Sequence, residues 1–303
     1  MKIQQATFRG VQGVPDLTLD LTDARTGGPH TVVVLSGPSA SGKTRMIEAL
    51  VAAKEAIRAY GLMVTGAPWI GEASAAKVRV TFQLDEAERE FAGTTSPSLG
   101  GEVIFRPDRV DCEADDGLRA MLGRYSHNPA HGKVDYFPAE RRIPTFPPFP
   151  GLGSGEQRVL RLGKDPRKYG FILPFLRTLD HDAPRRERFA AGLANLSPTC
   201  RYVADRSGEA SPRCFSSRGG APLTAAQLSH GEADAVIFAA TAAVIGLDHS
   251  IVFVDRPELH ADDVGHFVSG LASLGLDNQL ILALRPGLAA AAGDAQIVTL
   301  KGA

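Results

Sequence analysis

The sequence has little cysteine, almost no net charge and no long apolar run, and each shortage excludes a class of protein. Only three cysteines occur among 303 residues, and their spacing fits neither a zinc site nor a disulfide framework. The 33 basic and 34 acidic residues leave a formal charge of −1, which excludes a globally basic nucleic-acid coat protein and a strongly acidic tail. No apolar run approaches the roughly 18 residues of a membrane span, and no signal-peptide segment follows the first lysine. We therefore expect a cytoplasmic protein without membrane association.

Enough apolar sequence remains for a sizeable core, and it alternates between strand and helix patterns. Residues 31–35 (TVVVL) are typical of a strand buried on both faces, and residues 44–60 carry apolar side chains at helical spacing. Residues 77–84 (KVRVTFQL) alternate with period two and can pair with residues 102–105, which indicates an antiparallel layer. The last third predicts helix 232–245, strand 250–254, helix 262–270, strand 279–284 and a short strand near 297–300. This order predicts an α/β fold with a mostly parallel sheet flanked by helices.

A phosphate-binding loop follows the first buried strand. The string GPSASGKT fits G-x-x-x-x-G-K-[ST] and comprises Gly37, Pro38, Ser39, Ala40, Ser41, Gly42, Lys43 and Thr44. The glycines let the backbone wrap closely, so that N–H groups and the helix N-terminus face the phosphates. Lys43 is then expected at the β- and γ-phosphates and Thr44 at Mg²⁺. A glycine turn that contains Lys-Thr by chance is the alternative, and the strand–helix frame counts against it.

Two later segments complete the pattern. Residues 251–255 (IVFVD) predict a buried strand that ends in Asp255, a carboxylate suited to Mg²⁺ beside a phosphate loop. Residues 228–232 (LSHGE) open an apolar helix, and Ser229 with Glu232 would also be explained by a capping box alone. The order of the three motifs, with about 185 residues between the first and LSHGE and about 20 more to the acidic strand, favours the functional interpretation.

With these motifs the sequence resembles the ABC-type ATPase heads of the SMC, RecF and OLD-like group, in particular small bacterial AAA-family ATP-binding proteins of DNA repair and phage defence. The N-terminal KIQQATFRGV, the segment VDYFPAERR and the strand IVFVDRPELH fall in the family's order. The resemblance implies a P-loop NTPase head with a mostly parallel core sheet, an antiparallel β layer and a helical lobe. One lobe would span about 1–143 and 247–303, and the helical, signature-bearing lobe about 144–246. ATP and Mg²⁺ are the implied cofactors.

The resemblance also implies partners. Two heads would sandwich two ATP molecules, with Ser229, Gly231 and Glu232 of one head facing the γ-phosphate held by the other, in a homodimer or a heterodimer with a related head. Glu140 is a candidate for the family's Q-loop position, and a surface salt bridge is its alternative. Because the chain has no heptad run for coiled-coil arms and no acidic cluster typical of a nuclease, we expect an effector protein on a separate chain.

The sequence departs from the family at two positions that handle the attacking water. The family's glutamate after the Mg²⁺ aspartate is replaced by Arg256, and its switch histidine by Arg285. A guanidinium has no acceptor and stays protonated, so it cannot act as a base. Loss of a general base costs about 10²–10⁴ in rate, so we expect slow or partner-dependent hydrolysis. The alternative is that Glu258, His260 or a partner supplies the missing group.

A basic stretch leaves the choice of function open. Residues 141–188 hold 11 lysines and arginines against 5 acidic residues, which is typical either of a solvated surface or of a patch for nucleic acid. Three functions are therefore considered. The first is an ATP-binding switch subunit, the second an active DNA-dependent ATPase clamp or motor, and the third a phosphoryl-transfer kinase, against which LSHGE and the late acidic strand count.

Overall fold

The computed structural model describes residues 1–125, 128, 132–144, 158–204, 213–217, 220–257 and 263–301. Its central feature is a parallel five-stranded sheet of order β13-β3-β12-β11-β7. The strands are β3 (Val32–Ser36), β7 (Val134–Phe137), β11 (Ile251–Asp255), β12 (Gln279–Leu284) and β13 (Gln296–Thr299). All four neighbouring pairs run parallel, so the prediction of a mostly parallel sheet is confirmed.

A second, antiparallel sheet has the order β2-β1-β4-β5-β6. Its strands are β1 (Lys2–Arg9), β2 (Leu17–Asp20), β4 (Ala76–Gln83), β5 (Ser98–Phe105) and β6 (Val110–Ala114). The predicted pairing of residues 77–84 with 102–105 is present as β4 against β5. A small antiparallel sheet at the far end of the molecule joins β8 (Arg201–Tyr202), β9 (Phe215–Ser216) and β10 (Pro222–Leu223).

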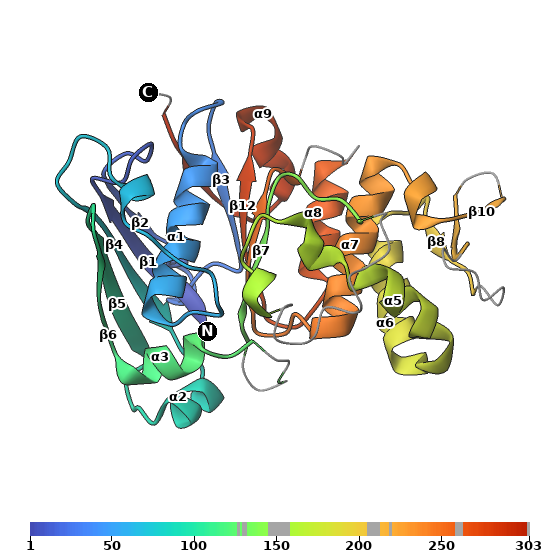
Figure 1. The fold of residues 1–303 in the computed structure, drawn as a ribbon, viewed down its shortest axis with the longest axis horizontal. Coiled ribbons are helices and arrows are strands. Elements are labelled where there is room, and N and C mark those ends of the chain that lie inside the picture. The colour runs from blue at the N-terminus through green and yellow to red at the C-terminus, as the bar shows by residue number, and fades with distance from the viewer. Residues whose placement is uncertain are drawn as a thin grey trace.

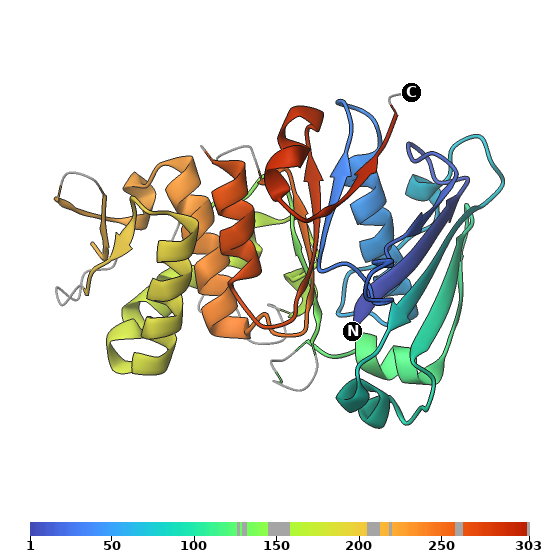
Figure 2. The same cartoon turned by 180° about the vertical axis from the view of Figure 1, so that it is seen from behind.

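The helices fill the layers around these sheets. Figures 1 and 2 show α1 between the antiparallel and the parallel sheet, and α5 to α8 on the opposite face of the parallel sheet. The helices are α1 (Lys43–Ile57), α2 (Glu86–Ala92), α3 (Asp116–Leu122), α5 (Ile172–Thr178), α6 (Ala183–Leu196), α7 (His230–Ile245), α8 (Val264–Ala272) and α9 (Pro286–Ala289). Within the described residues, no helix combines the length and the apolar character that crossing a bilayer needs.

Strand alternation divides the interior into two cores. Successive side chains of a strand point to opposite faces, so Ile251 and Phe253 of β11 pack with α1 and the antiparallel sheet, whereas Val252 and Val254 pack with α7 and α8. Because α7 and the parallel sheet share one core, their relative positions are fixed by packing. The division into lobes at residues 144 and 246 stays a prediction.

Candidate nucleotide-binding site

The candidate site lies at the carboxyl edge of the parallel sheet. Register pairs Ser36 of β3 with Leu284 of β12, and Ala283 of β12 with Asp255 of β11. The phosphate loop, Arg285 and Asp255 therefore leave neighbouring strands at one edge. Ligands of open α/β sheets bind at such edges because the loops that follow the strands converge there.

The phosphate loop has a backbone that its glycines permit. Gly42 has φ +90°, and a Cβ added there would lie 2.3 Å from the carbonyl oxygen of Gly13. A Cβ at Gly37 would lie 2.4 Å from the Ser41 hydroxyl. Ala40 also adopts a left-handed conformation, with φ 63°, which a non-glycine residue holds only where its surroundings enforce it. The two glycines of the motif are thus required by the shape of the loop itself.

The loop ends at a helix terminus suited to an anion. Among the described residues no side chain caps α1, and its first turn holds no acidic residue. The positive end of the helix dipole and the first N–H groups consequently face the loop. Lys43 lies over it, and its ammonium donates to the carbonyls of Gly37 (2.6 Å) and Pro38 (2.7 Å). These features suit a polyphosphate.

Thr44 and Asp255, predicted from segments 211 residues apart, are in direct contact. The Thr44 hydroxyl donates to both carboxylate oxygens of Asp255, at 2.9 and 3.0 Å. Asp255 is 2% exposed, and burial is the main reason why its pKa is raised above the ordinary value. The Thr44 hydrogen bond opposes this rise, the charge of Glu48 adds to it, and Arg141 and Arg256 oppose it.

This pair fits a magnesium ion. A hydroxyl and a carboxylate are hard oxygen donors, and Mg²⁺ is usually held by one or two carboxylates plus phosphate oxygens rather than by an all-protein cage. The described part of the chain contains no cluster of three or more His, Cys, Asp or Glu side chains that could hold a metal ion. A buried, partly satisfied carboxylate is also the group that a cation would stabilise most.

The two arginines singled out from the sequence, Arg256 and Arg285, are both at this edge. Arg256 directly follows Asp255, is exposed, and has φ 49°, and its N–H donates to the Ala283 carbonyl at 3.1 Å. Arg285 is the exposed N-terminal flanking residue of α9, directly after β12. Glu258 and His260, the alternative catalytic residues, lie outside the described residues. The roles of all four stay predictions.

The LSHGE segment begins α7 with a capping box. Ser229 Oγ accepts from the Glu232 N–H (3.3 Å), and Glu232 Oε2 accepts from the Ser229 N–H (3.0 Å). The capping box that was the structural explanation for these two residues is therefore present. Ser229 is nevertheless exposed, with Gly231 half-buried behind it, so the first turn of α7 is accessible to another molecule.

Three functional candidates escaped the sequence prediction. Arg141 and Asp234 form a buried ion pair at 2.7 Å beside Asp255, whereas Glu140, the predicted Q-loop candidate, is exposed. A signal for Asp234 did exist, because a single carboxylate inside the apolar run ADAVIFAA requires a buried partner. The third is Glu48, whose charge reaches Asp255 from one turn further along α1.

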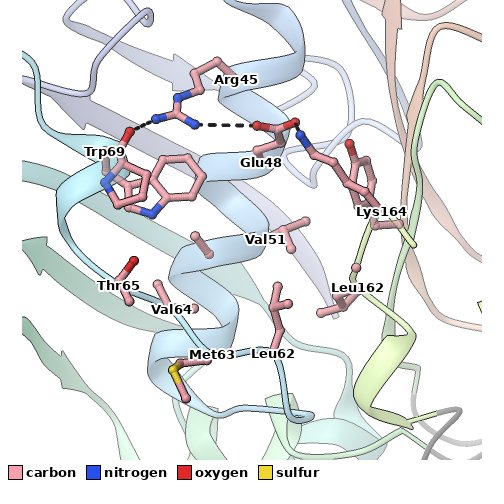
Figure 3. A pocket seen from close by; sticks show the side chains of 14 residues that line it. Arg45, Glu48, Val51, Leu62, Met63, Val64, Thr65, Trp69, Leu162 and Lys164 are labelled. Carbon is pink, nitrogen blue, oxygen red and sulfur yellow. Dashed lines mark hydrogen bonds and ion pairs between the residues drawn. The ribbon is translucent and has the colours of Figure 1, made fainter. Parts of the chain in front are cut away.

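Glu48 borders a cavity of about 310 Å³ along α1. Figure 3 shows Arg45, Glu48 and Lys164 joined along one wall, with 3.7 Å between Arg45 and Glu48 and a close ion pair from Glu48 to Lys164. Arg45 also stacks on Trp69 at 4.1 Å. The side chains below them, among them Val51, Leu62 and Leu162, are apolar. The cavity thus has a charged wall and an apolar floor.

The basic stretch 141–188 is partly used inside the protein. Burial lowers the pKa of Lys168 to about 7, and its ammonium donates to the carbonyl of Arg161 at 2.9 Å. Other basic residues are held by ion pairs: Arg141 with Asp234, Arg161 with Asp135, and Lys164 with Glu48. Exposed basic residues remain on α6, including Arg185 and Arg188, and also outside it, including Arg142, Arg167 and Arg177.

Comparison with known proteins finds similarity of fold to solved structures. No family model matches the sequence, and no curated protein matches it. The chain is similar to the SMC head domain from Thermotoga maritima, at 12% identity and TM-score 0.51, over 97% of this chain and 93% of that one. It is also similar to the SmcHead bound to the C-winged helix domain of ScpA, at 14% identity and TM-score 0.56, over 94% and 89%.

A further similarity is to the recombination mediator protein RecF-ATP of the RecFOR pathway, at 10% identity and TM-score 0.49, over 99% and 97%. The two SMC heads carry the conclusion on architecture, which agrees with the layers described above. The predicted α/β fold with a mostly parallel sheet is confirmed: the chain has the fold of these SMC head domains.

Proposed function

We propose that this protein is an ATP-binding switch subunit. The contact of Thr44 with Asp255 carries the proposal, because it brings the two expected Mg²⁺ ligands together at the mouth of a phosphate loop. Lys43 and the loop N–H groups bind the β- and γ-phosphates, and Thr44 and Asp255 hold the metal. When bound, Mg²⁺ neutralises phosphate charge and fixes the phosphate orientation.

ATP then joins two heads, with the phosphate loop of one facing the LSHGE turn of the other. The accessible N-terminus of α7 supports this arrangement, since a helix N-terminus attracts an anion. Pairing reports ATP occupancy to an effector protein on a separate chain. The resemblance of the motifs suggests DNA repair or anti-phage defence as the setting.

The proposal includes slow turnover. Arg256 occupies the turn directly after Asp255, and a guanidinium there can stabilise phosphate charge but cannot accept a proton from water. An active DNA-dependent ATPase clamp or motor that uses Glu258 or His260 is the alternative, and the exposed arginines of α6 are the feature that favours it.

Titration of the purified protein with a fluorescent ATP analogue and Mg²⁺ tests the binding step. Lys43→Ala should weaken binding about 10- to 150-fold, because a charge-assisted contact to phosphate contributes about 1.5–3 kcal/mol. Lys77→Ala, on the exposed face of β4, is the matched lysine control and should bind normally. Unchanged affinity in Lys43→Ala would overturn the proposal.

Phosphate release tests the turnover step. Wild type should be slow, and Arg256→Glu should be faster, up to the factor of about 10²–10⁴ that a general base supplies. Fast turnover by wild type with no gain in Arg256→Glu, and acceleration by DNA, would favour the clamp or motor instead.

A further inference from the structure

One buried side chain connects the two parts of the proposed switch. Arg141 follows β7 and lies between the turn after β11 and the helix α7 that begins with LSHGE. Its side chain is 0% exposed and that of its partner Asp234 is 2% exposed. A charged pair taken out of water at this depth persists only where its hydrogen bonds are well satisfied, so its contacts are informative.

Each N–H of the Arg141 guanidinium has an acceptor. Nε and Nη2 donate to Asp234 at 3.2 and 2.7 Å, forming a bidentate pair. Nη1 donates to the carbonyls of Pro138 (2.6 Å) and Asp255 (2.8 Å), and Nη2 also donates to the carbonyl of Arg256 at 3.4 Å. These five bonds match the five donors that arginine has, whereas lysine has only three.

The contacts on one side hold the turn that carries the metal ligand. Arg256 adopts a left-handed φ of 49°, which is unfavourable for a residue with a side chain and persists only where neighbouring groups impose it. Arg141 donates to the carbonyls of the two successive peptide groups that flank the Cα of Arg256, those of Asp255 and Arg256, while the Arg256 N–H donates to the Ala283 carbonyl. Arg141 therefore fixes the backbone from which the Asp255 carboxylate projects.

The contacts on the other side hold the signature helix. Asp234 lies two residues after Glu232 in α7, and the capping box at Ser229 makes this end of the helix continuous with the exposed turn. A helix transmits a displacement along its length because its backbone hydrogen bonds keep it rigid. A shift of the Asp255 turn thus reaches the first turn of α7 through one guanidinium.

We infer that Arg141 is a positioning residue that couples the metal-binding turn at Asp255 to the phosphate-facing turn of α7 within one head. The inference rests on the proposed function for its purpose, since it explains how one chain relates its own ATP occupancy to the turn it offers to a second head. The bridge itself can be tested without nucleotide.

A second buried ion pair supplies a matched control. Asp135, also on β7, forms a bidentate pair with Arg161 at 2.6 and 2.9 Å, with side-chain exposures of 4% and 7%. This pair joins β7 to the segment near residue 161. If Arg141 has a purely structural role, removing either ion pair should have the same effect on hydrogen exchange.

Hydrogen exchange of the full chain, read by mass spectrometry, separates the two explanations. The test variant is Arg141→Met with Asp234→Leu, which removes both charges together and leaves no unpaired one. The control is Arg161→Met with Asp135→Leu. Without nucleotide, amides in 250–257 and in 228–236 should exchange at least about 10-fold faster in the test variant, and should be unchanged in the control even if both variants unfold at a lower temperature.

A second arm adds MgATP. In wild type, amides in both 36–46 and 228–236 should become more protected, and in the test variant only those in 36–46. The coupling is overturned if MgATP protects the amides of 228–236 equally in wild type and in the test variant. It is also overturned if, without nucleotide, the control variant accelerates exchange in 250–257 and 228–236 as much as the test variant does. No response of 36–46 in wild type overturns the proposed ATP binding, and the nucleotide-free arm then still decides the bridge. If the double variant does not fold, Arg141→Lys, which keeps the charge but has three donors, decides the same comparisons.

Discussion

The buried charge of Asp255 predicts that the order of the Tm values of wild type and Asp255→Asn reverses when MgATP is added. Its carboxylate is 2% exposed, and burial raises its pKa against the opposing hydrogen bond from Thr44. Because this pKa is raised, the folded protein holds the proton of Asp255 more tightly than the unfolded chain does, so ionisation of Asp255 lowers the stability of the folded state. Asp255→Asn removes the charge and keeps an acceptor for the Thr44 hydroxyl. We expect it to stabilise the ligand-free protein by about 0.5–2 kcal/mol.

MgATP should reverse the order of the two proteins. A ligand that binds only the folded state at about 100 times its Kd stabilises it by about 2.7 kcal/mol, and the variant lacks the carboxylate that holds the metal. For a large domain, about 1 kcal/mol shifts the Tm by about 2 °C. Asp255→Asn should therefore unfold about 1–4 °C above wild type without ligand, and below it by a similar margin with MgATP.

The size of the ligand-free difference depends on pH with a defined sign. Below the ordinary aspartate value of 3.8, the acid is protonated in both folded and unfolded chains, and its full contribution to stability is present. As the pH rises through the raised pKa of the folded state, that contribution is lost. The advantage of Asp255→Asn should consequently be near zero at about pH 4 and grow toward neutral pH.

Differential scanning calorimetry at several pH values, with and without MgATP, measures these shifts. Asp135→Asn is the control, because Asp135 is equally buried but is paired with Arg161. Its loss leaves an uncompensated buried charge and should cost about 3–5 kcal/mol. A lower Tm for Asp255→Asn without ligand, or a MgATP shift equal to that of wild type, would refute the reasoning.

Three further predictions concern single positions. Gly42→Ala should abolish ATP binding and lower the unfolding free energy by about 1–3 kcal/mol. The control is Gly93→Ala, because Gly93 also has a positive φ but a Cβ added there would have no atom within 4 Å. This control should keep ATP binding, and ligand titration measures both variants. Gly231→Arg, at the start of α7, should prevent ATP-dependent dimers in light scattering and leave ATP binding intact. Burial lowers the pKa of Lys168 to about 7. The free energy of unfolding of the wild-type protein should therefore fall, relative to that of Lys168→Met, as the pH is lowered from about 10 toward 7, and urea unfolding at several pH values measures this.

The sequence predicted the parts of the fold that have a local signature. β3, β11 and β12 are continuously apolar because both faces are covered, and α1 follows a motif whose glycines are demanded by contacts with Gly13 and Ser41. Thr44 and Asp255 could be assigned to one site because parallel strands end at one edge. The pairing of α7 with the sheet carried no such signal, because α7 is apolar around most of its circumference.

The elements and site residues that the sequence patterns did not predict are those that depend on long-range contacts. β6, α2, α3 and α5 were not predicted, since short elements of five to seven residues are stabilised mainly by packing against distant parts of the chain. Glu140 stays a candidate for the Q-loop position, and the sequence patterns did not single out its neighbour Arg141, whose burial depends on a distant partner. Which of two adjacent charged residues points inward depends on Asp234, 93 residues later.

The contacts of the ligand-free site also explain why ATP binding should be sensitive to small changes there. The Thr44 hydroxyl now donates to Asp255, and Lys43 donates to the carbonyls of its own loop. If Thr44 coordinates Mg²⁺ as proposed, its hydroxyl would have to reorient, and a phosphate bound by Lys43 would replace one of the carbonyls that its ammonium contacts. Only the difference between old and new bonds appears as affinity. On the proposed coupling, a change at Asp255 reaches α7 through the hydrogen bonds of Arg141 to the Asp255 carbonyl and to the Asp234 carboxylate.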